Sequence, residues 1–151
     1  MQLALTRGRK NGFSLVELVI VVVILGIIGA IAIPRMSRGA AGASDSGLVA
    51  DLAVLRNAVE LYAAEHNGAY PTVADFVDQL TTYSDAAGDT NASKTSVYIF
   101  GPYLTSIPAL KVGTEAGGNT VAAAAGTGVA WIYDATNGTI SANAASPYDT
   151  Y

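Results

Sequence analysis

The sequence contains no cysteine, and this absence removes several kinds of chemistry at once. Without thiols there is no disulfide framework, no thiolate metal cluster and no cysteine nucleophile. His66 is the single histidine, so most zinc and Ser/His/Asp chemistry lacks its parts. The sequence also lacks a P-loop, a G-x-S-x-G motif and paired carboxylates of recognisable spacing. We therefore predict a protein that is not an enzyme.

Charge is scarce as well: 13% of the 151 residues are charged, against about 25% in an ordinary soluble domain. Eight basic and twelve acidic side chains leave a net charge of −4, so a nucleic acid is not an expected partner. Hydrophobic residues make up 51% of the chain. The length fits one domain. The next question is where in the chain the surplus of hydrophobic residues lies.

Most of the hydrophobic surplus lies in residues 13–33, where Glu17 is the single charge. At 1.5 Å per residue this segment would be about 31 Å long as a helix, which matches the hydrocarbon core of a bilayer. The basic residues Arg7, Arg9 and Lys10 precede it, and no acid lies among the first twelve residues. We expect a membrane span with a cytoplasmic N-terminus and an exported remainder.

An amphipathic helical pattern follows the span. Its apolar positions recur every three or four residues, which places them on one stripe of a helix: Leu48, Leu52, Leu55, Val59 and Tyr62. Asn67-Gly68 supplies a stop, and His66 is expected to interact with the helix dipole. We predict one long helix from the span to about residue 66, weakened in the middle by Gly39, Gly42 and Gly47.

Residues 67–151 predict a small α+β region. Thr72 and Asp75 resemble a capping box before a short helix that carries Phe76, Val77 and Leu80. Residues 84–96 are predicted to be a polar loop, and strands are predicted at residues 97–100, 129–133 and 139–142. Asn137-Gly138 would join the last two strands as a hairpin. The face formed by Val129, Trp131 and Tyr133 is expected to pack on the helical stripe.

Glu17 is the residue of the span that requires an explanation. An acid at a bilayer centre costs about 2.5 to 3.5 kcal/mol, less toward the interface, and is usually paired or functional. If the Gly12–Phe13 bond were cleaved, the new α-amino group of Phe13 would be its nearest cation. An ordinary secretory signal cut after Ala30-Ile31-Ala32 and a plain uncleaved anchor are alternatives, and both leave Glu17 without a role.

The junction K-N-G-F-S-L-V-E at residues 10–17, with the apolar run up to Pro34, resembles the type IV pilin and pseudopilin superfamily. The resemblance implies that a prepilin peptidase removes residues 1–12 as a leader peptide and methylates the amine of Phe13. It implies that Glu17 acts in methylation and in subunit recruitment. It also places a helix-kinking proline at Pro34 and the start of a partly melted stretch at Gly26.

The same resemblance implies an α+β type IV pilin-like fold, in which a long N-terminal helix packs on a small antiparallel β-sheet. Residues 13–33 would form the transmembrane and filament-core helix, residues 34–66 its amphipathic continuation, and residues 67–151 the globular region. Gly26 and Ala30 form a small-xxx-small pair that lets helices approach closely, and Pro34 lacks the N–H of one backbone bond.

Within the superfamily, the segments G-A-Y-P-T at residues 68–72 and W-I-Y-D at residues 131–134 resemble the major pseudopilin of type II secretion. The D-P-W-G segment and the acidic calcium loop of that family are missing, so no metal or other cofactor is predicted. The subunit of a type IV pilus, for adhesion, motility or DNA uptake, is the alternative. A signal-anchored periplasmic binding protein or enzyme is a further alternative, in which Glu17 would have no function.

The expected function is that of a structural subunit, stored in the bacterial inner membrane and polymerised into a periplasmic or extracellular filament. The expected partners are copies of the chain itself, the prepilin peptidase and methylase, the lipid bilayer and minor pilins or pseudopilins. An inner-membrane assembly platform and its ATPase are further expected partners.

Overall fold

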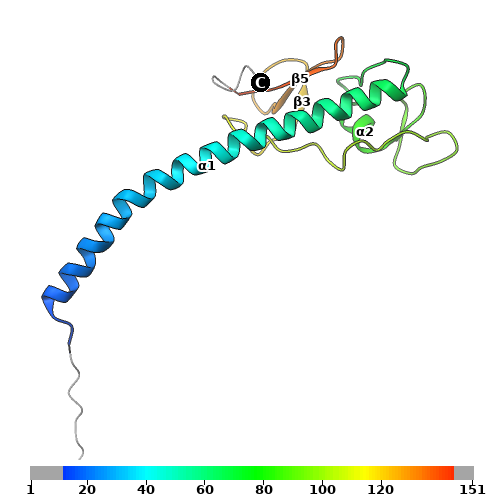
Figure 1. The fold of residues 1–151 in the computed structure, drawn as a ribbon. Coiled ribbons are helices and arrows are strands. Elements are labelled where there is room, and N and C mark those ends of the chain that lie inside the picture. Colours follow the sequence, from blue (N-terminus) through cyan, green and yellow to red (C-terminus); the bar gives the residue numbers. More distant parts are fainter. Residues whose placement is uncertain (1–11, 145–151) are drawn as a thin grey trace, which may run out of the picture. The chain divides into compact units, whose positions relative to one another are not determined.

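The structure is a computed structural model that describes residues 12–144, except for the side chains of residues 33–38. The chain divides into two compact units, Met1–Ala41 and Gly42–Tyr151. One long helix contributes to both units, and the short helix and all strands lie in the second (Figure 1).

Helix α1 (Leu15–Glu65) comprises 51 residues, which confirms the predicted single helix from the span to about residue 66. It ends because Asn67 and Gly68 adopt positive φ angles of 57° and 84°. The N–H of Gly68 then donates to the carbonyl of Ala63 at 2.8 Å, which satisfies one of the last free carbonyls of the helix. The glycines in the middle of α1 therefore do not interrupt it.

The predicted stripe of α1 is the helical half of the hydrophobic core. Leu48, Leu52, Leu55, Val59 and Tyr62 are each at most 2% exposed. They form one cluster with the fully buried Trp131 and Tyr133 of the sheet, so the expected packing of sheet on helix is confirmed. The stripe holds the second unit together because it buries the one face of the sheet that carries large side chains.

The main sheet has three strands in the order β3 (Val121–Ala122), β4 (Trp131–Asp134) and β5 (Thr139–Ala142). β4 and β5 pair antiparallel, with Trp131 opposite Ala142, as predicted from the Asn137-Gly138 turn. β3 pairs parallel with β4 and was not predicted, because its two residues lie in an alanine-rich stretch without alternation. The α+β, pilin-like fold class is nevertheless confirmed.

One loop prediction and one strand prediction for the segment between α1 and the main sheet were wrong. The predicted polar loop contains a short hairpin of β1 (Tyr83–Ser84) and β2 (Thr90–Asn91), closed by the carboxylate of Asp85, which accepts from the N–H groups of Ala87 and Asp89. The predicted strand at 97–100 is absent, apart from a bridge between Ser84 and Phe100. There Thr95 Oγ1 accepts the N–H groups of Val97 and Tyr98 in place of a neighbouring strand.

Helix α2 (Phe76–Thr81) follows the predicted Thr72 and Asp75 pair. The Thr72 hydroxyl donates to the Asp75 carboxylate at 2.9 Å, and the Asp75 N–H donates back to the Thr72 oxygen at 3.1 Å. The Thr72 N–H, however, donates to Gln79 rather than to Asp75, so the pair forms a turn before α2 and not a complete capping box. Phe76 and Leu80 of α2 are buried in the core.

Candidate processing and assembly site

Residues 12–14 form a segment without regular structure directly in front of α1. Phe13 is 83% exposed, and a side chain added at Gly12 would meet no atom within 4 Å. The peptide bond between them is therefore not shielded by the described residues. The leader residues Arg7, Arg9 and Lys10 lie outside the described part of the chain.

Glu17 occupies the first turn of α1, where a negative charge is favoured by the positive end of the helix dipole. Ser14 precedes α1, and the Leu18 N–H donates to the Ser14 carbonyl at 3.1 Å. Ser14 and Glu17 therefore have the S-x-x-E spacing of a capping box, a signal that the sequence analysis missed. This position gives Glu17 a local role in starting the helix, in addition to any role between subunits.

The apolar part of α1 has no partner within the described chain. Leu15–Ala32 has a mean hydropathy of 3.0, is not buried, and is long and apolar enough by these criteria to cross a membrane. Its large side chains are about half exposed or more on every side of the helix, including Leu18, Ile24 and Ile28. Because a helix that is apolar all round is stable only when it is covered, this segment requires lipid or neighbouring helices.

The small residues of the span are open in the same way. A Cβ at Gly26 would meet nothing within 4 Å, so no contact inside the chain requires a glycine there. Pro34 lies within the bounds of α1, and its side chain is outside the described residues. The roles of Gly26 in close approach and of Pro34 in bending the helix remain predictions about the assembled form.

His66 is buried and interacts with a carbonyl in the last turn of α1, in agreement with the interaction expected at the helix end. It is 5% exposed, and its ring stacks on Tyr62 with centroids 3.7 Å apart. Nδ1 lies 2.8 Å from the Tyr62 carbonyl and must therefore donate to it, so in the neutral ring Nε2 accepts from the hydroxyl of Ser84 at 3.1 Å. His66 thus connects the end of α1 to β1, and both of its ring nitrogens form hydrogen bonds.

Three tyrosines of the second unit carry raised pKa values for structural reasons. Burial is the main cause for Tyr62, Tyr103 and Tyr133. The Tyr103 hydroxyl also donates to Glu65 at 2.6 Å, and the Tyr133 hydroxyl donates to the Pro71 carbonyl at 3.0 Å. All three hydroxyls stay protonated and serve packing. Among the described residues, no group of three His, Cys, Asp or Glu side chains is placed to hold a metal ion.

Comparison with known proteins bears on both units. Residues 7–33 match the family model described as the prokaryotic N-terminal methylation motif. The chain is also similar to the type II secretion system core protein G of Aeromonas hydrophila, with 30% identity over 91 residues. The matched region covers 60% of this chain and 63% of that relative, so the chain spans less than two thirds of its length. No solved structure matches the chain.

These matches support the resemblance on which the sequence analysis relied. The methylation motif coincides with the leader, the Gly12–Phe13 junction and the apolar helix. The matched motif contains the whole of the apolar segment Leu15–Ala32, which is long and apolar enough to cross a membrane.

Proposed function

We propose that the chain is the major pseudopilin of a type II secretion system, a structural subunit without catalytic activity. The observation that carries the proposal is the methylation motif, which spans the Gly12–Phe13 bond and places Glu17 at the start of an uncovered apolar helix. The similarity to core protein G adds the secretion system to this proposal.

Maturation begins with hydrolysis of the Gly12–Phe13 peptide bond by a prepilin peptidase. Water supplies the elements that complete a carboxylate on Gly12 and an amine on Phe13. The amine nitrogen then attacks the methyl group of a sulfonium donor, which leaves as a thioether, and the nitrogen releases one proton. The cut removes the three basic residues of the leader and leaves an ammonium four residues before Glu17. The cation needed by Glu17 is therefore produced by the same step that releases the subunit for assembly.

The magnitudes favour pairing between subunits. An unpaired acid near the centre of a bilayer costs about 2.5 to 3.5 kcal/mol. Opposite unit charges about 4 Å apart attract by about 4 kcal/mol at an effective dielectric constant of 20. The pairing of Glu17 with the Phe13 amine of a neighbouring copy therefore offsets the cost of carrying the charge into a bundle of helices. A copy in the wrong register leaves both charges unpaired, so the pair also selects the register.

The proposed route starts in the inner membrane, with the N-terminus in the cytoplasm and the second unit exported. An assembly platform and its ATPase add copies to a periplasmic filament, with minor pseudopilins as further partners. The apolar surface of Leu15–Ala32, exposed in the single chain, is covered first by lipid and then by the helices of other copies.

Mass spectrometry of the N-terminus tests the processing step. The full chain, produced together with a prepilin peptidase, is expected to begin at N-methylated Phe13. Gly12→Leu is expected to keep residues 1–12, because a bulky side chain replaces the open position before the cut. A mature product that begins at Met1 or Ile33 would contradict the proposal.

Glu17 variants test the assembly step separately. Glu17→Ala is expected to give a stable membrane protein that does not form filaments, whereas Glu17→Asp keeps the charge and should retain part of the assembly. Loss of the helix-starting role alone would lower the helix content of both variants only slightly, which circular dichroism measures. Normal filaments from Glu17→Ala in electron micrographs would refute the pairing.

Complementation tests the assignment to secretion. An Aeromonas hydrophila strain without its core protein G is expected to regain export of folded proteins when it carries a hybrid with this chain's second unit. Failure of the hybrid to restore export, while it still forms filaments, would favour the pilus alternative.

A further inference from the structure

The three-stranded sheet of the second unit has an open edge at β3. β3 is the terminal strand, and no described residue pairs with its outer side. A groove of about 460 Å³ lies beside this edge, and its lining includes Val73, Val77 and Thr81 near α2 and Ile107, Thr120 and Val121 near the sheet. None of the lining residues is charged. Such a groove next to a free strand edge suits an extended peptide segment.

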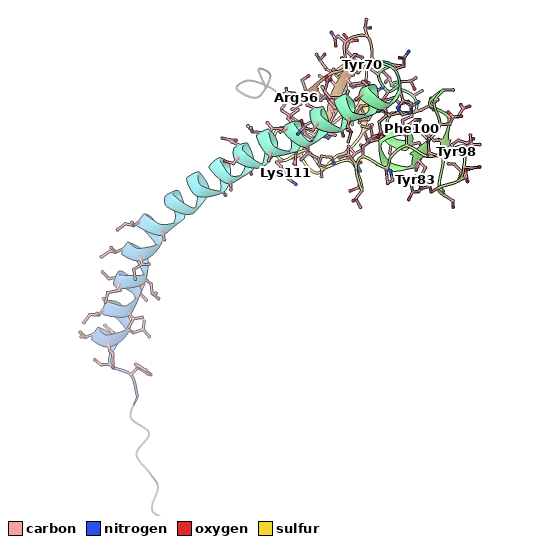
Figure 2. All side chains as sticks on the ribbon, turned by 45° about the vertical axis from the view of Figure 1, so that its right-hand side comes forward. Arg56, Tyr70, Tyr83, Tyr98, Phe100 and Lys111 are labelled. Atoms are coloured by element: carbon pink, nitrogen blue, oxygen red, sulfur yellow. The ribbon has the colours of Figure 1, made fainter. Side chains whose placement is uncertain are left out.

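The same unit carries a segment with the sequence of a strand but no strand partner, residues 97–99. Val97 is 58% exposed and Ile99 is 48% exposed, and both would lie on one side of an extended chain. Phe100 anchors the end of the segment through two backbone hydrogen bonds with Ser84. Within the described chain, the N–H and C=O of Ile99 form no backbone hydrogen bond. Figure 2 shows Tyr98 beside this anchor at the outer margin of the unit.

We propose that residues 97–99 of one copy add to the open edge of β3 in the next copy and place Val97 and Ile99 in the groove. This inference rests on the proposed filament function and specifies one contact between its subunits. The contact joins two different surfaces of identical chains. Such a head-to-tail contact builds an open filament whenever its rotation does not close into a ring, as the proposed assembly requires.

Two uncharged surfaces with one pair of opposite charges beside them favour a second copy as the occupant of this groove. Residues 42–144 contain ten acidic and three basic side chains, so two copies repel each other over most of their surfaces. The groove and residues 97–99 are both uncharged, so two copies can meet at these surfaces without repulsion between like charges. Lys94, just before the segment, forms no ion pair among the described residues, and Asp78 lies on α2 beside Val77. The pairing of these two charges would add attraction.

Cysteine cross-linking of assembled filaments tests the contact directly, because the chain has no cysteine of its own. The full chain with Ile99→Cys and Val121→Cys is expected to give a ladder of covalent multimers when filaments are treated with an oxidant. Either single variant should remain monomeric under the same treatment. A control pair of Ile99→Cys with Val54→Cys, on the exposed side of α1, should give no ladder.

The outcomes separate this contact from the proposed function. Filaments that form normally but give no ladder with the Ile99 and Val121 pair would overturn the strand addition and leave the filament function intact. A ladder of equal strength from the control pair would also overturn it, because cross-linking would then report crowding rather than a defined contact.

A binding experiment tests the groove without polymerisation. A fluorescent peptide with the sequence of residues 94–100 is expected to bind saturably to the detergent-solubilised full chain. Val121→Asp should weaken this binding at least tenfold, and Val54→Asp should leave it unchanged. No binding to the unsubstituted chain would refute the inference. If the peptide binds but the processed full chain forms no filaments, the docking surface is supported and the filament function is refuted.

Discussion

The packing of the sheet on α1 can be tested by removing one side chain from the stripe. Leu52 is 1% exposed and belongs to the cluster that includes Trp131 and Tyr133. Leu52→Ala removes buried methyl groups and leaves a cavity, which costs about 2 to 5 kcal/mol of the free energy of unfolding. Val54→Ala is the matched control, because Val54 lies two residues away and is 48% exposed. Its effect should stay within about 0.5 kcal/mol.

Trp131 provides the measurement, because it is the single tryptophan of the chain and is fully buried against this stripe. Urea unfolding of the full chain in detergent, followed by tryptophan fluorescence, is expected to show a midpoint lowered by about 1 M or more for Leu52→Ala. The slope of the transition should not change. Equal midpoints for the two variants would show that the sheet does not depend on the stripe and would refute the proposed core.

Three further substitutions test the remaining contacts of the second unit by the same measurement. Burial raises the pKa of Tyr133 in the folded chain, so the protonated hydroxyl stabilises the fold below about pH 10, and this stabilisation is lost as the pH rises further. Tyr133→Phe should therefore lose less stability between pH 8 and pH 11 than the parent chain. An identical loss would contradict this. Gly138 has a φ of 71°, and a Cβ there would overlap the ring of Tyr70. Gly138→Ala should cost more than about 1 kcal/mol, and an unchanged midpoint would disprove the close contact. His66→Ala removes the hydrogen bond between His66 and the buried Ser84 hydroxyl and should cost about 1 to 3 kcal/mol, whereas Ser84→Ala in the same background should cost little more.

The features that sequence predicted correctly are those with a repeating pattern. The stripe from Leu48 to Tyr62 repeats often enough to identify both the helix and its buried face. The β4–β5 hairpin combines alternation with a turn that needs glycine, and Gly138 indeed has a positive φ. Of the candidate site, the Gly12–Phe13 junction and Glu17 stand out in the sequence by composition and position, and their roles in processing and assembly stay predictions.

The features that sequence missed depend on contacts between distant segments. β1, β2 and β3 have two residues each, too few to show any periodicity. Residues 97–99 have strand-forming side chains, but no neighbouring segment offers them an edge, so propensity alone predicted the wrong structure. The burial of His66 depends on Ser84, eighteen residues later, which no local pattern around the helix end could reveal.

The two halves of α1 differ in how their apolar side chains are covered. Between Leu15 and Ala32 the helix is apolar on all sides and is not covered by any of residues 12–144, so it adds nothing to the folded core that these residues form. From Leu48 onward one stripe is apolar, and it is buried in a single cluster with residues of the sheet, of α2 and of the loops of the same chain. The second unit therefore has its own core and does not need other copies to bury that stripe. In the proposed filament, the second unit would therefore be folded before assembly, and the energy of assembly would come from the surfaces that the single chain exposes.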